Sequence, residues 1–595
     1  MRVFVFLAVL TAWSGLASAL EFREVRWGFH GAVKRHAYNL CSIDLLNPSP
    51  EAFRGSIQLK KQGSVGSSDF PLVELDVYIG AGEMRTVQFL PYISSDKPDW
   101  EVSWGPRAAD SFEFSYPKGE FTAPVAVQFF ADRGVSSPLK GIEVFPEQDF
   151  PIGAAGTETL GSVVLDHVPR WDQVRSRAFR DWLGRGGRLY LIHGRDGEPL
   201  RFPSPLEDLN VPADRFQVGQ GVVLRHGIAQ DAGEIPGLIT EVAQASVDPN
   251  NDYANQNYGT EPASNGITQL FQTMRNMVRP DHNWALIFFL AMIYLLILFP
   301  GIWLVSRKRG DFRVTYAMIL GTVLLFSWFY AEIGKRGYGE STGLREMMIA
   351  YPLGNQRVAL QKHGSLFVTE GGEYVIPAHG EGAVFTLESG ADFSGNATII
   401  NRPQAIVAAD IPPFSACSYQ QSSVLPTKGD YSITVKKLEL NPGLSKVEVQ
   451  LGPGMPIDAQ VYLLPTTQGV SVSGYSLTKG ENGWINSSPA MPVNSLFPTE
   501  YNYNWNRVDS AQNQRNLIGY LVQIATSAPL APQYQNQAQP VPSQAGSTST
   551  MPFEGGHILV YCDAPAEFLP TDYPASGKVL FVLKVDPSMA TSPTP

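Results

Sequence analysis

Two uninterrupted apolar stretches stand near the middle of this chain, between flanks in which hydrophobic and polar positions alternate. They run from Trp284 to Val305 and from Val314 to Ala331, and neither contains Asp, Glu, Lys, Arg or His. A helix of about 20 apolar residues spans a bilayer, and about 18 residues can still cross. The pattern therefore predicts a transmembrane hairpin with helices at 284–305 and 314–331. The alternative, two core helices of a soluble protein, is disfavoured because neither stretch has a polar face.

A short basic loop, residues 306–313, joins the two apolar stretches. Loops rich in Lys and Arg remain on the cytoplasmic side of a membrane. We therefore expect a cytoplasmic loop with both large flanks outside, and an anchor rather than a transport path, because the stretches lack the ionisable groups that ion paths use. The residues that set this topology are Arg307, Lys308, Arg309 and Arg313.

Residues 1–19 are typical of an export signal peptide. Arg2 precedes an apolar run from Val3 to Ala12, and Ala17-Ser18-Ala19 fits the rule for small residues at the cleavage site. Cleavage after Ala19 is expected, and an uncleaved anchor would leave the topology unchanged. The signal and the basic loop agree that the flanks lie outside the cytoplasm.

The exported flanks alternate with period two and are interrupted by Asn-Pro and Gly turns, which favours β-strands. Residues 20–139 resemble an immunoglobulin-like β-sandwich. Residues 140–240 differ, since a strand at 162–169, a helix at 175–187 and a strand at 188–194 indicate a parallel α/β unit. The predicted fold is thus a multidomain membrane protein: β-sandwich, α/β domain, two transmembrane helices and a C-terminal β-rich region.

Residues 241–283 form a predicted linker that ends in an amphipathic helix over 265–280. One face of this helix carries Ile267, Leu270, Phe271, Met274, Met277 and Val278. It could lie along the membrane interface or beneath the α/β domain, and a stiff connector is favoured over a lipid sensor. After the hairpin, two β-rich domains are expected at 332–429 and 430–595. The Pro/Gln/Ser-rich residues 527–552 are expected to be a flexible insertion.

Composition narrows the function classes. The net charge is −11 and the pI about 5.4, which argues against nucleic-acid binding through phosphate contacts. Cys41, Cys417 and Cys562 lie far apart, so buried thiols are favoured over a disulfide framework, although one pair could form and leave a third thiol. No metal or cofactor motif is present, and residues 248–261 depart from a calcium loop at its glycine and glutamate positions.

Two segments carry a resemblance to a known group of proteins. "SVVLDHVP…FRDWLGRGGRLYLIHG…VGQGVVL" and "YLLILFPGIWLVSRKRG" are similar to large bacterial inner-membrane proteins with an exported class I glutamine-amidotransferase-like domain and a central transmembrane hairpin. The resemblance covers roughly 162–337. It implies an exported β-domain, an amidotransferase-like domain, a hairpin and a further β-rich region. Genes of that group often neighbour those of MoxR-type ATPases and von Willebrand-type proteins.

The chain departs from true glutamine amidotransferases at the nucleophile. The turn after "RLYLI" reads Ile192-His193-Gly194-Arg195-Asp196, and no cysteine occurs between Cys41 and Cys417. Without a thiolate, nothing there attacks an amide carbonyl. We therefore predict no catalytic residue and a pseudo-catalytic domain. His167, His193 and Asp196 remain a candidate ligand-binding set at the strand ends, and His193 paired with Asp166 or Asp196 is the catalytic alternative.

These observations favour a non-enzymatic scaffold or binding subunit of a bacterial envelope complex. It would be anchored in the inner membrane with most of the chain extracytoplasmic. The expected partners are the lipid bilayer and other envelope or membrane subunits, with no cofactor and no nucleic acid. An envelope hydrolase with an unrecognised α/β site, or a transmembrane sensor, is the alternative.

Overall fold

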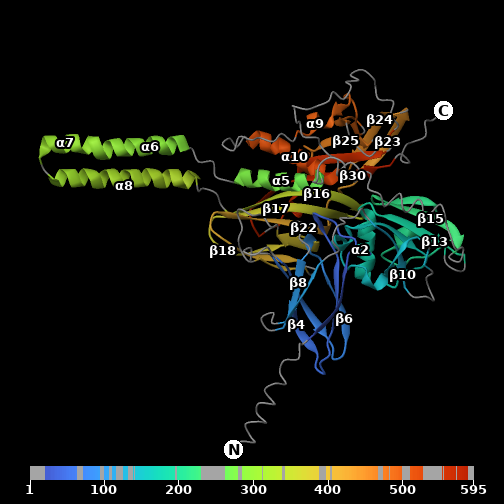
Figure 1. Ribbon diagram of the computed structural model, residues 1–595. Coiled ribbons are helices and arrows are strands. Elements are labelled where there is room, and N and C mark those ends of the chain that lie inside the picture. Colours follow the sequence, from blue (N-terminus) through green and yellow to red (C-terminus); the bar gives the residue numbers. More distant parts are fainter. Residues whose placement is uncertain are drawn as a thin grey trace, which may run out of the picture.

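The computed structural model describes residues 20–586 except for 63–70, 94–98, 106–109, 116–124, 132–137, 140, 194–196, 230–261, 279–283, 311, 338–341, 387–396, 402–404, 442, 467–472, 482, 499–509, 527–552, 554 and 571. The signal-like residues 1–19, the calcium-loop-like residues 248–261 and the insertion 527–552 lie outside this description. Strands dominate the described residues, and two apolar helices project from the body (Figure 1). The β-rich, multidomain character predicted from the sequence is confirmed.

The N-terminal part is built from two facing groups of strands. The first sheet has the order β1-β3-β6, and β2 pairs with β7 beside it. In β4, Ile57 and Leu59 point into the core while their neighbours are more exposed, as the alternating sequence predicts. The strands are β1 (Glu21–Trp27), β2 (Ala37–Tyr38), β3 (Cys41–Leu46), β4 (Phe53–Lys61), β5 (Leu72–Ile79), β6 (Met84–Phe89), β7 (Tyr92–Ile93), β8 (Asp99–Trp104) and β9 (Asp110–Ser115).

The second N-terminal sheet contains strands from beyond the apolar hairpin. Its order is β18-β21-β20-β5-β4-β8-β9. The junction is parallel, with Thr398 opposite Leu72 and Ile399 opposite Val73. The added strands are β18 (Gly372–Pro377), β20 (Ala397–Ile400) and β21 (Ile406–Ile411). One sheet is therefore assembled from segments on either side of the hairpin.

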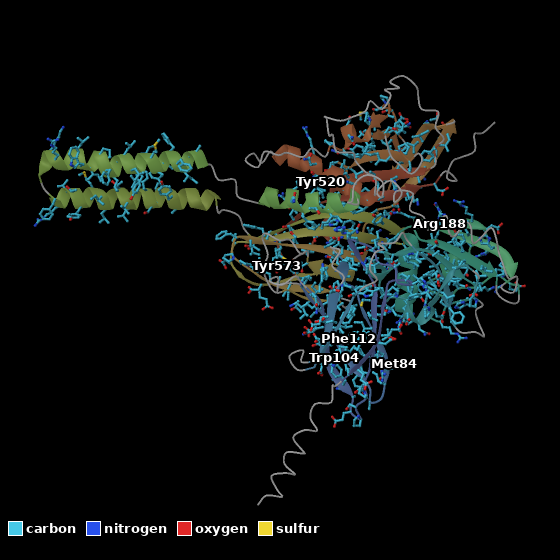
Figure 2. The ribbon with its side chains drawn as sticks, in the orientation of Figure 1. Met84, Trp104, Phe112, Arg188, Tyr520 and Tyr573 are labelled. Atoms are coloured by element: carbon cyan, nitrogen blue, oxygen red, sulfur yellow. The ribbon has the colours of Figure 1, made fainter. Side chains whose placement is uncertain are left out.

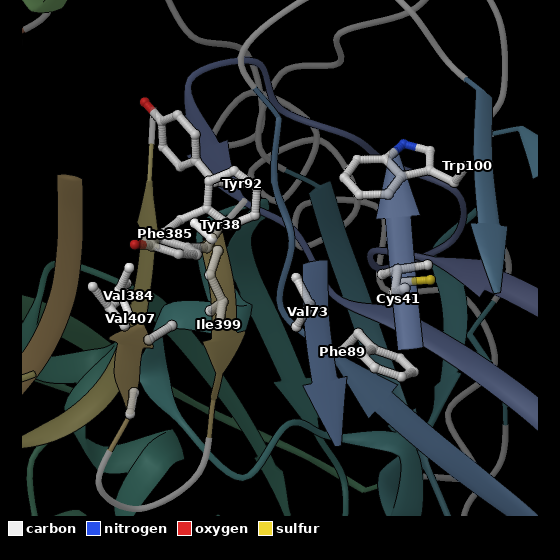
Figure 3. Packing of buried hydrophobic residues seen from close by; sticks show 14 of the residues in the cluster. Tyr38, Cys41, Val73, Phe89, Tyr92, Trp100, Val384, Phe385, Ile399 and Val407 are labelled. Carbon is white, nitrogen blue, oxygen red and sulfur yellow. The ribbon is translucent and has the colours of Figure 1, made fainter. Parts of the chain in front are cut away.

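A single hydrophobic core fills the space beside this shared sheet. Figure 3 shows Val73 and Tyr92, which precede the hairpin, close to Phe385 and Ile399, which follow it. The rings of Tyr92 and Phe385 lie 6.1 Å apart. Cys41 and Cys417 are buried in the same cluster and Cys562 in another, and none is bridged. Residues that precede the hairpin and residues that follow it therefore share one buried core.

The α/β unit is a mostly parallel sheet with the order β11-β10-β12-β13-β15-β14. Helix α2 (Gln173–Gly184) begins where the Asp172 side chain accepts the Arg175 N–H, and it buries Phe179 and Trp182. The strands are β10 (Val125–Phe130), β11 (Glu143–Pro146), β12 (Leu160–Leu165), β13 (Arg188–His193), β14 (Arg215–Val218) and β15 (Gly221–Ala229).

The α/β sheet begins earlier than the sequence division at 139–140. Strand β10 pairs in parallel with both β11 and β12, so it belongs to this sheet rather than to the sandwich. Its Val127 and Phe129 are fully buried beside Phe179. A short alternating strand fits either environment, and only the pairing partner distinguishes them.

The C-terminal region forms one large mixed sheet with the order β19-β22-β17-β16-β30-β29-β25-β26-β27-β24-β23, and β28 pairs with β26. The division predicted at 429–430 does not separate two sheets, because β16 pairs in parallel with the last strand, β30. The strands are β16 (Gly343–Gly354), β17 (Arg357–Val368), β19 (Glu381–Thr386), β22 (Ser415–Pro426), β23 (Ile433–Asn441), β24 (Gly443–Leu451), β25 (Gln460–Thr466), β26 (Ser473–Lys479), β27 (Trp484–Ile485), β28 (Met491–Pro492), β29 (Gly555–Asp563) and β30 (Ala575–Val585).

The α/β unit is joined to the C-terminal sheet by buried polar contacts. The Arg357 guanidinium on β17 donates to both carboxylate oxygens of Asp181 on α2, at 2.7 and 2.9 Å. Burial raises the pKa of Asp181 to about 6 although Arg357 opposes this shift. The Gln220 amide donates to the Val582 carbonyl at 2.7 Å. These contacts fix the unit against the rest of the body.

The predicted connector helix is present as α5 (Pro262–Val278). It lies against α10 (Ser510–Thr526) and the C-terminal sheet, with Leu270 and Met274 fully buried. Its apolar face is therefore packed within the body rather than beneath the α/β unit, because it is covered by α10, a helix that the sequence pattern did not reveal.

The apolar hairpin consists of α6 (Trp284–Leu296), a π-helical turn (Ile297–Gly301), α7 (Ile302–Arg309) and α8 (Phe312–Gly337). Two of the described helical segments, Ala285–Val305 and Phe312–Ala331, are long and apolar enough to cross a membrane, and only 6% of each is buried within the molecule. The soluble-core alternative is thereby disfavoured. The predicted loop 306–313 is shorter than expected, since the first helix continues to Arg309 and ends at Gly310, whose φ is +62°.

Candidate functional site at the carboxyl edge of the parallel sheet

The candidate site lies where the parallel strands of the α/β unit end, the edge at which such sheets place their ligands. Strand β12 ends at Leu165 and is followed by Asp166 and His167, and β13 ends at His193. Leu165 lies opposite Leu191 in the parallel pairing. His167 and His193, each two residues beyond this pair, therefore lie at the same level of the sheet.

His167 is held between two carboxylates. Its Nδ1 lies 2.6 Å from Asp166 Oδ1, and its Nε2 lies 3.0 Å from Glu147 Oε2. All three side chains are buried, with 5%, 2% and 6% of His167, Asp166 and Glu147 exposed. Glu147 comes from a 3-10 turn (Glu147–Asp149) that follows β11. The cluster thus ties this turn to the end of β12.

Neighbouring groups fix the Asp166 carboxylate and the backbone of the turn that carries Glu147. The Gln128 amide donates to Asp166 Oδ2 at 2.9 Å, and Gln128 Oε1 accepts the Leu139 N–H at 2.8 Å. The Trp171 indole N–H donates to the Glu147 carbonyl at 2.7 Å, and its ring stacks on Phe150 with centroids 4.9 Å apart. These contacts leave the imidazole little freedom to turn.

The electrostatics of the cluster determine what it can do. Burial alone lowers the pKa of His167, but the hydrogen bonds and charges of Asp166 and Glu147 outweigh it and raise the pKa to about 9. The imidazole is therefore protonated at neutral pH and donates from both nitrogens. In that state it can neither accept a proton from a substrate nor bind a metal ion. The geometry suits a structural ion cluster.

The other predicted site residues are placed differently. His193 is half-buried at the end of β13. Its imidazole lies beside Gly227 of β15, where Cε1 is 3.7 Å from the position that a Cβ would take. Asp196 lies outside the described residues. Within the described ranges, no group of three His, Cys, Asp or Glu side chains could hold a metal ion. The His167 imidazole is hydrogen-bonded to Asp166 and Glu147 rather than to His193.

Sequence reasoning missed Glu147 and Gln128. Glu147 stands in a short turn of "VFPEQDFP", and Gln128 sits in the middle of an apolar strand. A lone polar residue within the buried strand "VAVQFF" was the available signal for Gln128, because buried polar groups need hydrogen-bond partners. Glu147 had no such signal.

We expect His167 to make stability depend on pH in the mildly alkaline range. Its pKa in the folded protein, about 9, exceeds the ordinary value of 6.5. The stabilising contribution of the protonated imidazole is therefore complete below about pH 6.5 and is lost as the pH rises through about 9. It amounts to about 3 kcal/mol. Thermal unfolding of the wild type and His167→Gln between pH 6 and 10 measures this, and the difference between them should shrink toward the alkaline end.

The matched control is His30→Asn, since His30 is exposed and pairs with exposed Glu143 at 3.3 Å. His30 has a φ of +54°, a conformation that asparagine tolerates. This variant should keep the pH dependence of the wild type. A constant difference between wild type and His167→Gln across the range would contradict the charged state assigned to the imidazole.

Comparison with known proteins places the chain in no family. No protein-family model and no curated protein matches it. Among solved structures, the Pseudomonas fluorescens alkylpurine DNA glycosylase AlkC bound to DNA is 13% identical, with a TM-score of 0.14, over 18% of this chain and 33% of that one. A cycloisomaltooligosaccharide glucanotransferase from Paenibacillus sp. is 9% identical, with a TM-score of 0.16, over 79% of this chain and 98% of that one.

The chain thus spans about a third of the length of the glycosylase that it matches. At these TM-scores, neither likeness carries an argument about fold or activity.

Proposed function

We propose that this protein is a non-enzymatic, membrane-anchored scaffold or binding subunit of a bacterial envelope complex. In this proposal the hairpin lies in the inner membrane, the basic turn faces the cytoplasm, and the body stands outside. The body presents the β-sandwich and a pseudo-catalytic amidotransferase-like unit to other subunits. The group of inner-membrane proteins that the sequence resembles is the proposed family.

The observation that supports this most is the sheet shared across the hairpin. Strand β20 pairs with β5, and both contribute to one buried core. A chain that enters and leaves a bilayer through two adjacent helices returns to the side from which it came. The co-folded body therefore suits a topology with both arms on one side. The exposed Arg307, Lys308 and Arg313 at the far end of the hairpin suit the cytoplasmic side.

The state of His167 favours a scaffold over a hydrolase. An envelope hydrolase that uses a histidine at the carboxyl edge as its base needs that imidazole unprotonated near pH 7. His167 is instead held charged by Asp166 and Glu147. This supports a binding role for the α/β unit, and the ligand set of His167, His193 and Asp196 stays a prediction.

Cysteine labelling of intact cells tests the topology. Met84 precedes the hairpin and is 64% exposed, and Ile457 follows the hairpin and is 92% exposed. The three native cysteines are buried. We expect Met84→Cys and Ile457→Cys to react with a membrane-impermeant maleimide, and Gly310→Cys to react only after the inner membrane is permeabilised. Protection of either arm position in cells with an opened outer layer would contradict the proposal.

Affinity purification in a mild detergent tests the role as a subunit. Co-purification of stoichiometric membrane or envelope proteins supports the scaffold. Recovery of the chain by itself, with turnover of an envelope substrate, would identify the hydrolase instead. Dependence of a cytoplasmic partner's activity on an outside ligand would identify the sensor.

A further inference from the structure

Three segments of the body converge where the chain leaves helix α8. Thr342 is the first described residue after that helix, and its Oγ1 accepts the Thr369 N–H at 3.4 Å. Leu344 N–H donates to the Pro574 carbonyl at 2.9 Å. We define the membrane-proximal rim as the segments at this end of the sheets, which are 369–375, 412–414 and 572–574.

Strand register places the segment 412–414 beside the segment 369–375. Val368, the last residue of β17, lies opposite Ser415, the first residue of β22. Gly372, the first residue of β18, lies opposite Ile411. The turn 412–414 therefore stands next to the turn that follows β17. Figure 1 shows β18 on the side of the body that faces the hairpin, and Figure 2 shows Tyr573 on that same side.

The rim displays apolar and aromatic side chains. Phe414 is 53% exposed and Val375 is 45% exposed. The half-buried rings of Tyr374 and Tyr573 lie 6.4 Å apart, and the Tyr573 hydroxyl donates to the Val375 carbonyl at 2.8 Å. Rings that combine an apolar face with a polar hydroxyl are the side chains that concentrate at membrane–water interfaces.

Phe414 is held in a strained conformation. Its φ is +55°, in the left-handed region that bulky residues avoid. It follows Pro412 and Pro413 at the tip of the turn between β21 and β22. Strain of this kind persists only where the surrounding structure imposes it. Here the strained residue is also one of the exposed aromatics.

The length of α8 sets the height of the rim above the bilayer. The apolar segment ends at Ala331, but the helix continues to Gly337. That continuation is about 9 Å long at 1.5 Å per residue. The headgroup layer is about 5–8 Å thick on each side, the difference between a bilayer of about 40–45 Å and its core of about 30 Å. The helix therefore carries the chain through the headgroup layer and ends at about its outer surface.

We propose that the membrane-proximal rim is a second membrane contact, which rests on the headgroup layer of the bilayer that the hairpin enters. This inference rests on the proposed membrane anchoring. The contact is made by Phe414, Val375 and the Tyr374–Tyr573 pair rather than by charge, because the exposed ionic side chains of the rim, Glu370, Glu373 and Asp572, are acidic. It holds the body at a fixed angle to the membrane.

Spin labelling of the full chain in phosphatidylcholine vesicles tests the contact. Nitroxide is attached to Phe414→Cys, to Val375→Cys as a second rim position, and to Met84→Cys as the control. Met84 is 64% exposed and lies farther from the hairpin in Figure 2. The vesicles carry a small share of lipid with a nickel-chelating headgroup. We expect nickel to relax both rim labels several-fold more than the label at Met84, and high salt to leave this difference unchanged.

Each outcome bears on one statement. Equal relaxation at the rim and at Met84, in protein that floats with the vesicles, overturns the rim contact and leaves the anchoring intact. Failure of the protein to float overturns the anchoring itself. Rim labels that are remote from lipid in vesicles but immobilised in native membranes would assign the rim to a protein partner, which also overturns the lipid contact. Loss of the difference in high salt would refute a contact made by apolar rings.

Discussion

Replacing residues 279–341 with a flexible Gly/Ser linker of about 20 residues should convert the protein from a membrane-bound to a soluble, folded form. A linker of this length spans about 25 Å on average. The hairpin contributes little to the core, since only 6% of each apolar segment is buried. The body is held by its own contacts across the junction, including β5 with β20 and α5 with α10. Membrane fractionation and near-UV circular dichroism measure the result.

The matched control adds Ile399→Asp to the linker variant. Ile399 is fully buried opposite Val73, so an unpaired carboxylate there should prevent the two arms from closing. Ile457→Asp, at a residue that is 92% exposed, should have no such effect. Limited proteolysis that releases two independently folded arms from the linker variant would contradict the shared core.

Lys362→Met should strongly destabilise the body, because it leaves a buried carboxylate without its cation. Lys362 Nζ lies 3.2 Å from Glu346 Oε2, and the Tyr419 hydroxyl donates to Glu346 Oε1 at 2.5 Å. All three side chains are 0–1% exposed. Breaking a buried ion pair by removing one partner costs about 3–5 kcal/mol. The urea midpoint of the full chain in detergent, followed by tryptophan fluorescence, measures the loss.

The double variant Lys362→Met/Glu346→Gln should recover most of that stability. Glutamine removes the uncompensated charge but keeps an oxygen that accepts the Tyr419 hydroxyl. Lys437→Met removes an exposed lysine paired with Glu439 and should leave the midpoint unchanged. If the double variant were as unstable as the single one, the loss would come from disrupted side-chain contacts in the core rather than from the buried charge.

Local patterns were sufficient for much of the fold. The strand, helix and strand expected between 162 and 194 correspond to β12, α2 and β13. The amphipathic helix before the hairpin corresponds to α5. Each of these elements buries one apolar face. The period of that face can be recognised from consecutive residues alone.

The candidate site could be predicted only in part. His167 and His193 follow adjacent strands, so their level in the sheet was visible from the sequence. The partner that decides the chemistry, Glu147, comes from a separate turn, and its approach to within 3.0 Å of His167 depends on how β11 packs beside β10. A histidine with one carboxylate could act as a base, whereas one with two is fixed as a cation.

The sequence by itself determined the two apolar helices, the basic turn between them and the β-rich character of both flanks. These properties follow from hydrophobicity and period along consecutive residues. The tertiary structure alone decided that the flanks form one body, through the pairing of Leu72 with Thr398 and of Val73 with Ile399. The physical reason is that the backbone of a strand can form hydrogen bonds with the free edge of many other strands. The choice between distant partners therefore depends on the total apolar area that the assembled core removes from water.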